Sequence, residues 1–502
     1  MSWKKGLTAL SVGLAIVLLF AIHPSVNSYH VGFAGVGLVG VFLASIVVGA
    51  LTRRLVVLSA LLFLAFVEPE IRVTNSLVFN IVSNGLIIGA VSTWLLDSRR
   101  IYISLVPVLG ILGMFALMTI IGPLVAGWTG WIHIHDALMF MKYGMVAVIA
   151  ASAFRVGKSG KIDANWKLPV VALAAGSAAA AGFTIIQSFH ILAINQWVFG
   201  TYFGWKFTET ELSTDSIALL TNGTYFRAFG VAGQLGTSVL LASSLGGWLL
   251  LLGLAKSPVA TRLLVFGMSG VLLAIFLTGT RLGMIAAVVV LAIGAGWWVF
   301  SSQRHRAIRP VLSPIMVAVM LIVVATNTNY AFGETFATAT NRVVSTIPDL
   351  LDGNTDASLY SRLIQYSELD RVYFGLGRER DTALNNEYLI FLHRFGPAGF
   401  FVTWLAWGLL FKLTAQSAFG RSGSSSRWLG VAGFLAVVAA IVAGIGTESL
   451  LNPAMMTIIF GLAGATAATS LRTSVAVPAA IFVLDTGSTV SQDGPREEST
   501  AA

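Results

Sequence analysis

Long apolar segments alternate with short polar ones along almost the whole chain. A helix needs roughly 20 residues to cross the hydrocarbon core of a bilayer, and fourteen segments approach this length. They cover residues 6–23, 31–51, 55–67, 77–96, 101–126, 137–154, 168–192, 235–254, 263–280, 282–301, 310–327, 386–411, 428–446 and 453–470. The third segment is short and the ninth and tenth almost touch, so twelve crossings are an alternative. The pattern predicts an all-α, polytopic membrane helix bundle of 12–14 transmembrane helices.

Two polar intervals and a polar tail interrupt this pattern. The intervals cover residues 193–234 and 327–386, and the tail begins at about residue 471. A loop as long as 327–386 more often has a function than merely connects two spans, and we interpret it as the lid of an active site. The end of the tail is rich in small and polar residues, which predicts disorder. The chain thus divides into a membrane bundle, 1–470, and a largely disordered cytoplasmic tail, 471–502.

The composition favours a membrane protein and excludes several other classes. Hydrophobic residues make up 56% of the chain and charged residues 11%, which is too apolar for a water-soluble protein. The chain has no cysteine, so disulfides and thiol catalysis are excluded. The N-terminus has the basic start and apolar stretch of a signal peptide but no small-residue cleavage site. We therefore expect it to form a retained first helix.

The positions of the basic residues predict the orientation in the membrane. If the N-terminus is cytoplasmic, the inner segments contain 20 of the 31 Lys and Arg residues and only six of the 22 Asp and Glu residues. This distribution follows the positive-inside rule. It places both termini in the cytoplasm and both long loops outside. It also accounts for the net charge of +9 without a nucleic-acid partner.

Among the basic residues that lie outside the inner segments, three arginines from separate stretches are candidates for one site, whereas Arg371, Arg378 and Arg380 alternate with acidic residues and are interpreted as a solvated charge network. Arg227 precedes the eighth span, Arg281 lies between the ninth and tenth spans, and Arg362 lies in the large loop. A guanidinium stays ionised and its fork of donors fits phosphate oxygens, so the three together indicate a phosphate-binding site. Each also has a structural alternative. Arg281 could snorkel at the membrane boundary, and Arg227 could pair with an acidic residue of its own loop, Glu209, Glu211 or Asp215.

Polar residues inside the predicted spans form a second group of candidates. Lys142 lies in the sixth span, and His393 and Arg394 lie in the twelfth. Such residues are costly in a membrane and usually face a cavity or a partner. Arg394 either lines the site or forms a structural pair. Lys142 has the same two interpretations, with Asp136 or Glu70 as the structural partner.

Four stretches, in this order, resemble the O-antigen ligase and polymerase family, which includes Wzy-type polymerases of exopolysaccharide and capsule. They are TYFRAFGVAGQLG with Arg227, LTGTRLGMIA with Thr280 and Arg281, SLYSRLIQYSELDRVYFGLG with Arg362, Gly375 and Gly377, and NNEYLIFLHRFGPAGF with Asn386, Tyr388, Leu389, Gly396 and Gly399. The resemblance covers about residues 221–412 and rests on the order and spacing of the stretches.

The resemblance implies a GT-C-like bundle that transfers glycans on the outer face of the cytoplasmic (inner) membrane. A polymerase of a bacterial surface polysaccharide would move the glycan from polyprenyl pyrophosphate to the sugar of a lipid-linked repeat unit. Its partners would be that lipid-linked oligosaccharide and membrane lipid, with a chain-length regulator and a flippase as further candidates. No cofactor, nucleotide or metal is implied. Arg227, Arg281 and Arg362 would be catalytic by neutralising the pyrophosphate, and substrate would bind to Asn385, Asn386, Tyr388, Arg394 and Gly377.

The group that accepts the proton of the acceptor hydroxyl is open in this chain. Ligases of the family typically have His before Asn-x-Tyr-Leu, and many polymerases have Asp, whereas this chain has Asn385. Asn cannot act as a general base. Glu387 is the first candidate for this catalytic role and Asp381 the second. The departing pyrophosphate could also take the proton itself.

Other function classes predict different features. A ligase that transfers the glycan to a lipid or protein acceptor shares every motif, and Asn385 favours the polymerase. A transporter of lipid-linked glycans should have charges along a path through the bundle, and Lys142, His393 and Arg394 are too few for such a path. A non-catalytic assembly scaffold would tolerate alanine at Arg227, Arg281 and Arg362 without loss of polymer.

Overall fold

The computed structural model describes most of the predicted spans. The described residues are 31–67, 76–97, 100–125, 131–154, 166–189, 234–301, 309–326, 340, 387–420, 424–445, 452–470 and 474–476. The first predicted span lies outside them. So do the two long loops, apart from Gln234 and Thr340, and almost the whole tail.

The described residues form thirteen α-helices, one short 3-10 helix and two short strands. The helices are α2 (Val31–Leu51), α3 (Arg54–Val67), α4 (Ser76–Asp97), α5 (Val106–Val125), α6 (Trp131–Ala153), α7 (Leu168–Gln187), α10 (Gln234–Leu254), α11 (Pro258–Leu277), α12 (Arg281–Ser301), α13 (Arg309–Thr326), α16 (Glu387–Phe419), α17 (Ser424–Gly444) and α18 (Pro453–Ser470). Each one coincides with a predicted segment, from the second to the fourteenth. The ninth and tenth segments are separate helices, α11 and α12, and the all-α prediction is confirmed.

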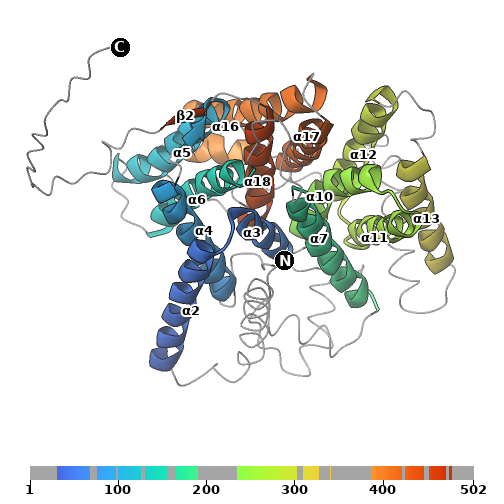
Figure 1. Cartoon of the computed structure of the whole chain (residues 1–502), viewed down its shortest axis with the longest axis horizontal. Helices are drawn as coiled ribbons and strands as arrows, with labels where there is room; N and C mark the ends of the chain where they lie inside the picture. The colour runs from blue at the N-terminus through green and yellow to red at the C-terminus, as the bar shows by residue number, and fades with distance from the viewer. Residues whose placement is uncertain are drawn as a thin grey trace, which may run out of the picture.

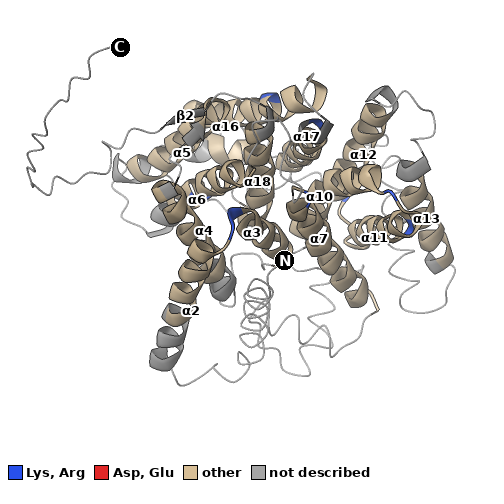
Figure 2. Cartoon of the chain, viewed as in Figure 1, with Lys and Arg blue, Asp and Glu red and all other residues tan. Residues whose placement is uncertain are grey.

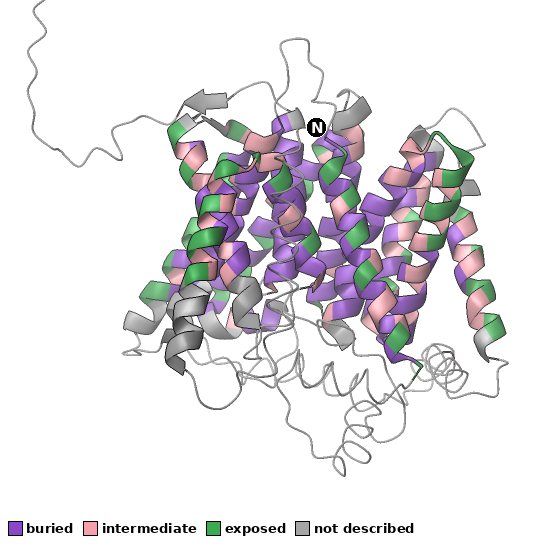
Figure 3. Ribbon diagram, turned by 60° about the horizontal axis from the view of Figure 1, so that its bottom comes forward, coloured by how far each residue is buried: buried purple, intermediate pink, exposed green. Residues whose placement is uncertain are grey.

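Seven of the described helices are long and apolar enough to cross a membrane, judged by length and composition. They are α5, α7, α10, α11, α12, α16 and α17, and six other described helices have shorter apolar stretches. Large apolar side chains are also exposed: Phe266 is 72% exposed, and Met316 and Phe401 are each 66% exposed. Figure 3 shows exposed residues, in green, along the helices at the outside of the bundle. Exposing so much apolar surface on so many helices is unfavourable in water but favourable in the hydrocarbon core of a bilayer. The chain is a multi-pass membrane protein.

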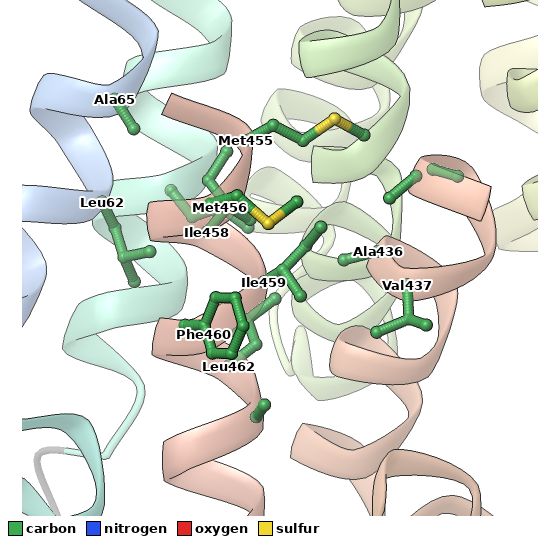
Figure 4. Close-up of a cluster of buried hydrophobic side chains, with 14 of the residues drawn as sticks. Leu62, Ala65, Ala436, Val437, Met455, Met456, Ile458, Ile459, Phe460 and Leu462 are labelled. Carbon is green, nitrogen blue, oxygen red and sulfur yellow. The ribbon is translucent and has the colours of Figure 1, made fainter. Parts of the chain in front are cut away.

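Helix α18 lies at the centre of the bundle (Figure 1). Every side chain of α18 that the structure describes, from residue 453 to residue 468, is buried. The helix packs against α3, α6, α16 and α17. Figure 4 shows Met455, Ile459 and Phe460 of α18 among Leu62 of α3 and Val437 of α17. A helix that is apolar on all sides is stable only when other helices or lipid surround it, and α18 is surrounded by other helices.

Small residues allow the closest helix contacts in this core. A Cβ atom added at Gly464 of α18 would lie 2.9 Å from the backbone carbon of Ala147 and 2.9 Å from Cβ of Ala150, both in α6. It would also collide with the carbonyl oxygen of Ala147. Lipid tails are as apolar as the helix surfaces, so the hydrophobic effect does not bring membrane helices together, and they associate mainly by close packing. Gly464 therefore sets the distance between α18 and α6.

The two strands connect the segment before α5 to the segment after α18. β1 (Arg100–Tyr102) leads into the 3-10 helix η2 (Ile103–Leu105), and it pairs antiparallel with β2 (Ser474–Ala476) in the register Arg100 to Ala476. The sequence predicted neither strand, and β2 belongs to the tail predicted as largely disordered. The pairing places the start of the fifth predicted span and the end of the fourteenth on the same face of the bundle. The alternating topology requires this.

Helix α16 differs from the continuous span predicted at 386–411. It extends to Phe419 and is broken near its start, where Gly396 has φ 67 and ψ −164 and Pro397 follows. Proline lacks an N–H group and its ring collides with the preceding turn, and the positive φ suits a residue without a side chain. The first part of α16, from Glu387 to Phe395, is therefore a short helix of its own direction.

Candidate functional site

Few of the residues that the structure describes are charged (Figure 2). Of the Lys and Arg side chains that the structure describes, seven belong to predicted inner segments: Arg53, Arg54, Lys167, Lys256, Arg262, Lys412 and Arg427. The other two are Arg281 and Lys142. These two are thus the described basic side chains that the positive-inside rule does not explain.

Four of the nine predicted site residues belong to the described part of the chain. The other five lie outside the described residues: Arg227, Arg362, Gly377, Asn385 and Asn386. Glu387 and Arg394 have a described backbone in α16, with Glu387 as the first residue of the helix and Arg394 two residues before the break at Gly396. Arg281 and Tyr388 are described with their side chains.

Arg281 is the first residue of α12 and is half-buried. Three residues separate it from the end of α11, and among them Gly279 has φ 60. A cation at this position is unfavourable for the helix itself, because a helix N-terminus carries about half a positive charge. Helix stability therefore gives no reason for arginine at residue 281. The position is instead favourable for an anion, which would interact with both the guanidinium and the first N–H groups of α12.

Thr280 connects the start of α12 to the start of α10. Its Oγ1 donates a hydrogen bond to Oγ of Ser238 at 2.6 Å, and both side chains are buried. Helix α10 begins at Gln234, soon after the stretch that contains Arg227. Sequence reasoning missed Ser238 because nothing in its flanking residues, Thr237 and Val239, distinguishes it from other serines in apolar helices.

Arg281 and Glu387 lie at the same end of the bundle. The hydroxyl group of Tyr388 donates to the carbonyl oxygen of Ile441 at 3.0 Å, so α16 begins beside the end of α17. At the other end of α16, the carbonyl oxygen of Ala418 accepts a hydrogen bond from Nε1 of Trp297, near the end of α12, at 3.2 Å. The second part of α16, after the break at Gly396, therefore runs in the same direction as α12, and both helices begin at one end of the bundle. Helix α17 packs against both.

Tyr388 fixes the first part of α16 to α17. Its side chain is 5% exposed and stacks on Trp404, with ring centroids 4.6 Å apart and an interplanar angle of 9°. Its hydroxyl group lies beside Gly444, where an added Cβ would be 3.0 Å away. These contacts anchor the helix start that contains Glu387. The predicted contact of Tyr388 with substrate stays a prediction.

Lys142 is buried in α6, with 9% of its surface exposed. Its Nζ donates to Oγ of Ser83 in α4 at 3.2 Å. The proposed structural partners Asp136 and Glu70 have no described side chain. The described surroundings of this ammonium are therefore neutral.

We expect Lys142→Met to raise the midpoint of thermal unfolding, measured in detergent by intrinsic fluorescence. The unbranched apolar side chain fills the same space, and replacing a buried charge by a hydrophobic residue is often stabilising, here by about 1 kcal/mol. Lys142→Ala is the control, because it removes the same charge but leaves a cavity and should lower the midpoint. If Lys142→Met instead destabilises by about 3 kcal/mol or more, a carboxylate pairs with Lys142.

Among the described side chains, no three His, Asp or Glu residues gather at one place where they could hold a metal ion. No family model matches the chain, and no curated protein matches it either. The resemblance of the four stretches to O-antigen ligases and polymerases is thus a prediction based on the order of their residues.

Proposed function

We propose that this protein is a membrane glycosyltransferase that polymerises a bacterial surface polysaccharide on the outer face of the cytoplasmic membrane. Its donor would be a glycan on polyprenyl pyrophosphate, and its acceptor the sugar of a lipid-linked repeat unit. The observation that carries the proposal is the place of Arg281. It is half-buried at the first residue of α12, at the end of the bundle where α16 begins with Glu387. An arginine there serves an anionic ligand better than it serves the helix.

The order of the other candidate residues supports the same proposal. Arg227 lies just before α10, which is hydrogen-bonded to the residue preceding Arg281, and Arg362 lies in the loop that leads to α16. Three arginines from separate segments would thus approach one end of the bundle. Together they would match the charge of a pyrophosphate.

The reaction requires little beyond placement and charge. A bond forms between the acceptor hydroxyl oxygen and the anomeric carbon of the donor glycan, while the bond from that carbon to the pyrophosphate oxygen breaks. The negative charge that develops on the pyrophosphate is stabilised by the guanidinium groups. The proton of the acceptor hydroxyl passes to the carboxylate of Glu387 or to the departing pyrophosphate.

The proposal is tested with the purified full-length protein in nanodiscs, supplied with the lipid-linked repeat unit of its own organism and with neither nucleotide nor metal. We expect a ladder of repeats on a gel, because each transfer lengthens the glycan by one unit. A single transfer of the glycan to a different lipid or protein acceptor would show that the protein is a ligase and contradict the proposed polymerase activity. Binding of the lipid-linked unit without turnover would favour a transporter and contradict the proposal.

A further inference from the structure

The turn between α11 and α12 has little conformational freedom. It consists of Thr278, Gly279 and Thr280. The N–H group of Gly279 donates to the carbonyl oxygen of Phe276 at 2.9 Å, and its φ of 60 is strained for any residue with a side chain. The carbonyl oxygen of Thr280 accepts the N–H group of Met284 at 3.2 Å, so Thr280 caps the helix that Arg281 begins.

A chain of buried hydroxyl groups crosses this turn. Oγ1 of Thr278 donates to the carbonyl oxygen of Ile275 at 2.7 Å and lies 2.9 Å from Oγ1 of Thr280. Thr280 in turn donates to Ser238 at 2.6 Å. The exposed fractions of Thr278, Thr280 and Ser238 are 0%, 8% and 0%. The chain therefore joins the end of α11, the start of α12 and α10 within the interior of the protein.

Close packing at Gly283 strengthens this junction. An added Cβ atom at Gly283 would collide with Cβ and Oγ of Ser238, and it would lie 3.0 Å from Oγ1 of Thr280. Helices α10 and α12 thus pack closely where the hydroxyl groups meet. Arg281 lies between Thr280, the last residue of the turn, and Gly283 of α12, and both of these residues lie against Ser238.

The hydrogen bond between Thr280 and Ser238 differs from those of nearby hydroxyl groups. Ser243 and Ser244 on the same helix α10 are also fully buried, but they donate to the carbonyl oxygens of Leu240 and Leu241 in their own helix. Such bonds satisfy a hydroxyl group without linking two helices. The bond of Thr280 orients one helix start relative to another, and loss of either hydroxyl group would remove this direct link between the two helices.

We propose that Ser238 and Thr280 are positioning residues that hold the guanidinium of Arg281 in place for a pyrophosphate group. The inference rests on the proposed function, since it takes this pyrophosphate to be that of the lipid-linked donor. A displacement of about 1 Å at a charge-stabilising group can cost about 100-fold in rate. The rigid turn, the hydroxyl chain and the close contact at Gly283 all limit such a displacement of the Arg281 backbone.

The test measures binding of farnesyl pyrophosphate to the full-length protein in nanodiscs, together with KM for the lipid-linked repeat unit. Thr280→Val keeps the shape of the side chain without its hydroxyl group, and Ser238→Ala removes the partner. We expect each to weaken binding of farnesyl pyrophosphate about tenfold, the equivalent of one buried hydrogen bond, and to raise KM. Thr280→Ser should restore binding. Ser243→Ala is the matched control, and it should bind as the wild type does.

The outcomes separate this inference from the proposed function. If Thr280→Val and Ser238→Ala bind like the wild type while Arg281→Ala does not, the positioning role is wrong and the arginine site stands. If the wild type makes polymer but shows no Arg281-dependent binding of farnesyl pyrophosphate, the inference fails and the polymerase stands. If the variants bind farnesyl pyrophosphate as expected but the wild type transfers no glycan, the positioning role is supported and the proposed glycosyltransferase activity is wrong. If Thr280→Ser fails to restore binding and the thermal midpoint falls with it, the role of Thr280 is structural only.

Discussion

Arg281→Ala is expected to reduce glycan transfer by about 100- to 1,000-fold, the effect of losing one charge-stabilising donor in a preorganised site. The guanidinium would bind the pyrophosphate of the donor and interact with it more strongly as its charge develops, so the loss should both raise KM and lower kcat. Arg281→Lys keeps the charge but loses the planar fork of donors, and an intermediate rate is expected. The measurement is the rate at which the repeat ladder grows in nanodiscs.

The control for this prediction is Arg262→Ala. Arg262 lies in the first turns of α11, exposed and in a predicted inner segment, while Arg281 follows the other end of the same helix. The Arg262→Ala variant tests whether loss of any arginine at a membrane boundary lowers the rate of glycan transfer. We expect unchanged rates and an unchanged thermal midpoint for Arg262→Ala. Equal rates for Arg281→Ala and the wild type would mean that Arg281 only anchors the helix at the boundary, and the pyrophosphate site would have to be abandoned.

Gly464→Leu is expected to disrupt the bundle itself. The new side chain would have to enter the contact between α18 and the backbone of α6 at Ala147, where even a Cβ atom has no space. Overpacking of a core typically costs 1–3 kcal/mol and more where backbone must move, so a loss of about 3 kcal/mol or more is expected. The yield of monodisperse protein in size-exclusion chromatography and the thermal midpoint in detergent would show it.

Gly408→Leu is the matched control for Gly464→Leu. Gly408 also lies inside a long helix, α16, but it is exposed and an added Cβ would meet no atom within 4 Å. Both substitutions gain the same helix propensity, so the difference between them isolates the contact with α6. We expect Gly408→Leu to be neutral or slightly stabilising. A Gly464→Leu protein that is as stable as Gly408→Leu would contradict the close packing of α18 on α6.

The positions of the helices follow from the sequence because the membrane imposes a simple requirement. Each crossing needs an apolar segment of about 20 residues, and the thirteen described α-helices coincide with predicted segments. The short helix α3 and the narrow turn between α11 and α12 were also visible in the sequence. The break in α16 was less evident, since glycine and proline are common in membrane helices. The structure reveals the change of direction through the positive φ of Gly396 and the stacking of Tyr388 on Trp404.

The contacts between helices could not be predicted in this way. In a soluble protein the polar face of a helix points to water and so identifies the buried face. Here apolar side chains face both lipid and protein, so the pattern along α10 or α18 does not indicate which residues meet a neighbour. Only the arrangement of the helices shows which side chains are hydrogen-bonded across them, namely Ser238 with Thr280, Lys142 with Ser83, and Tyr388 with the carbonyl oxygen of Ile441.

The sequence by itself determined that this is a chain of membrane helices and where most of them begin and end, and it predicted which arginines lie on the outer side. Those features depend only on the order of residues along the chain, because the length of each apolar segment and the positions of the charged residues decide them. The tertiary structure decided that α18 lies at the centre, that α12 and α16 begin at the same end, and that Thr280 beside Arg281 is bonded to Ser238. These features depend on which small side chains allow two helices to approach, and close packing of residues far apart in sequence decides that.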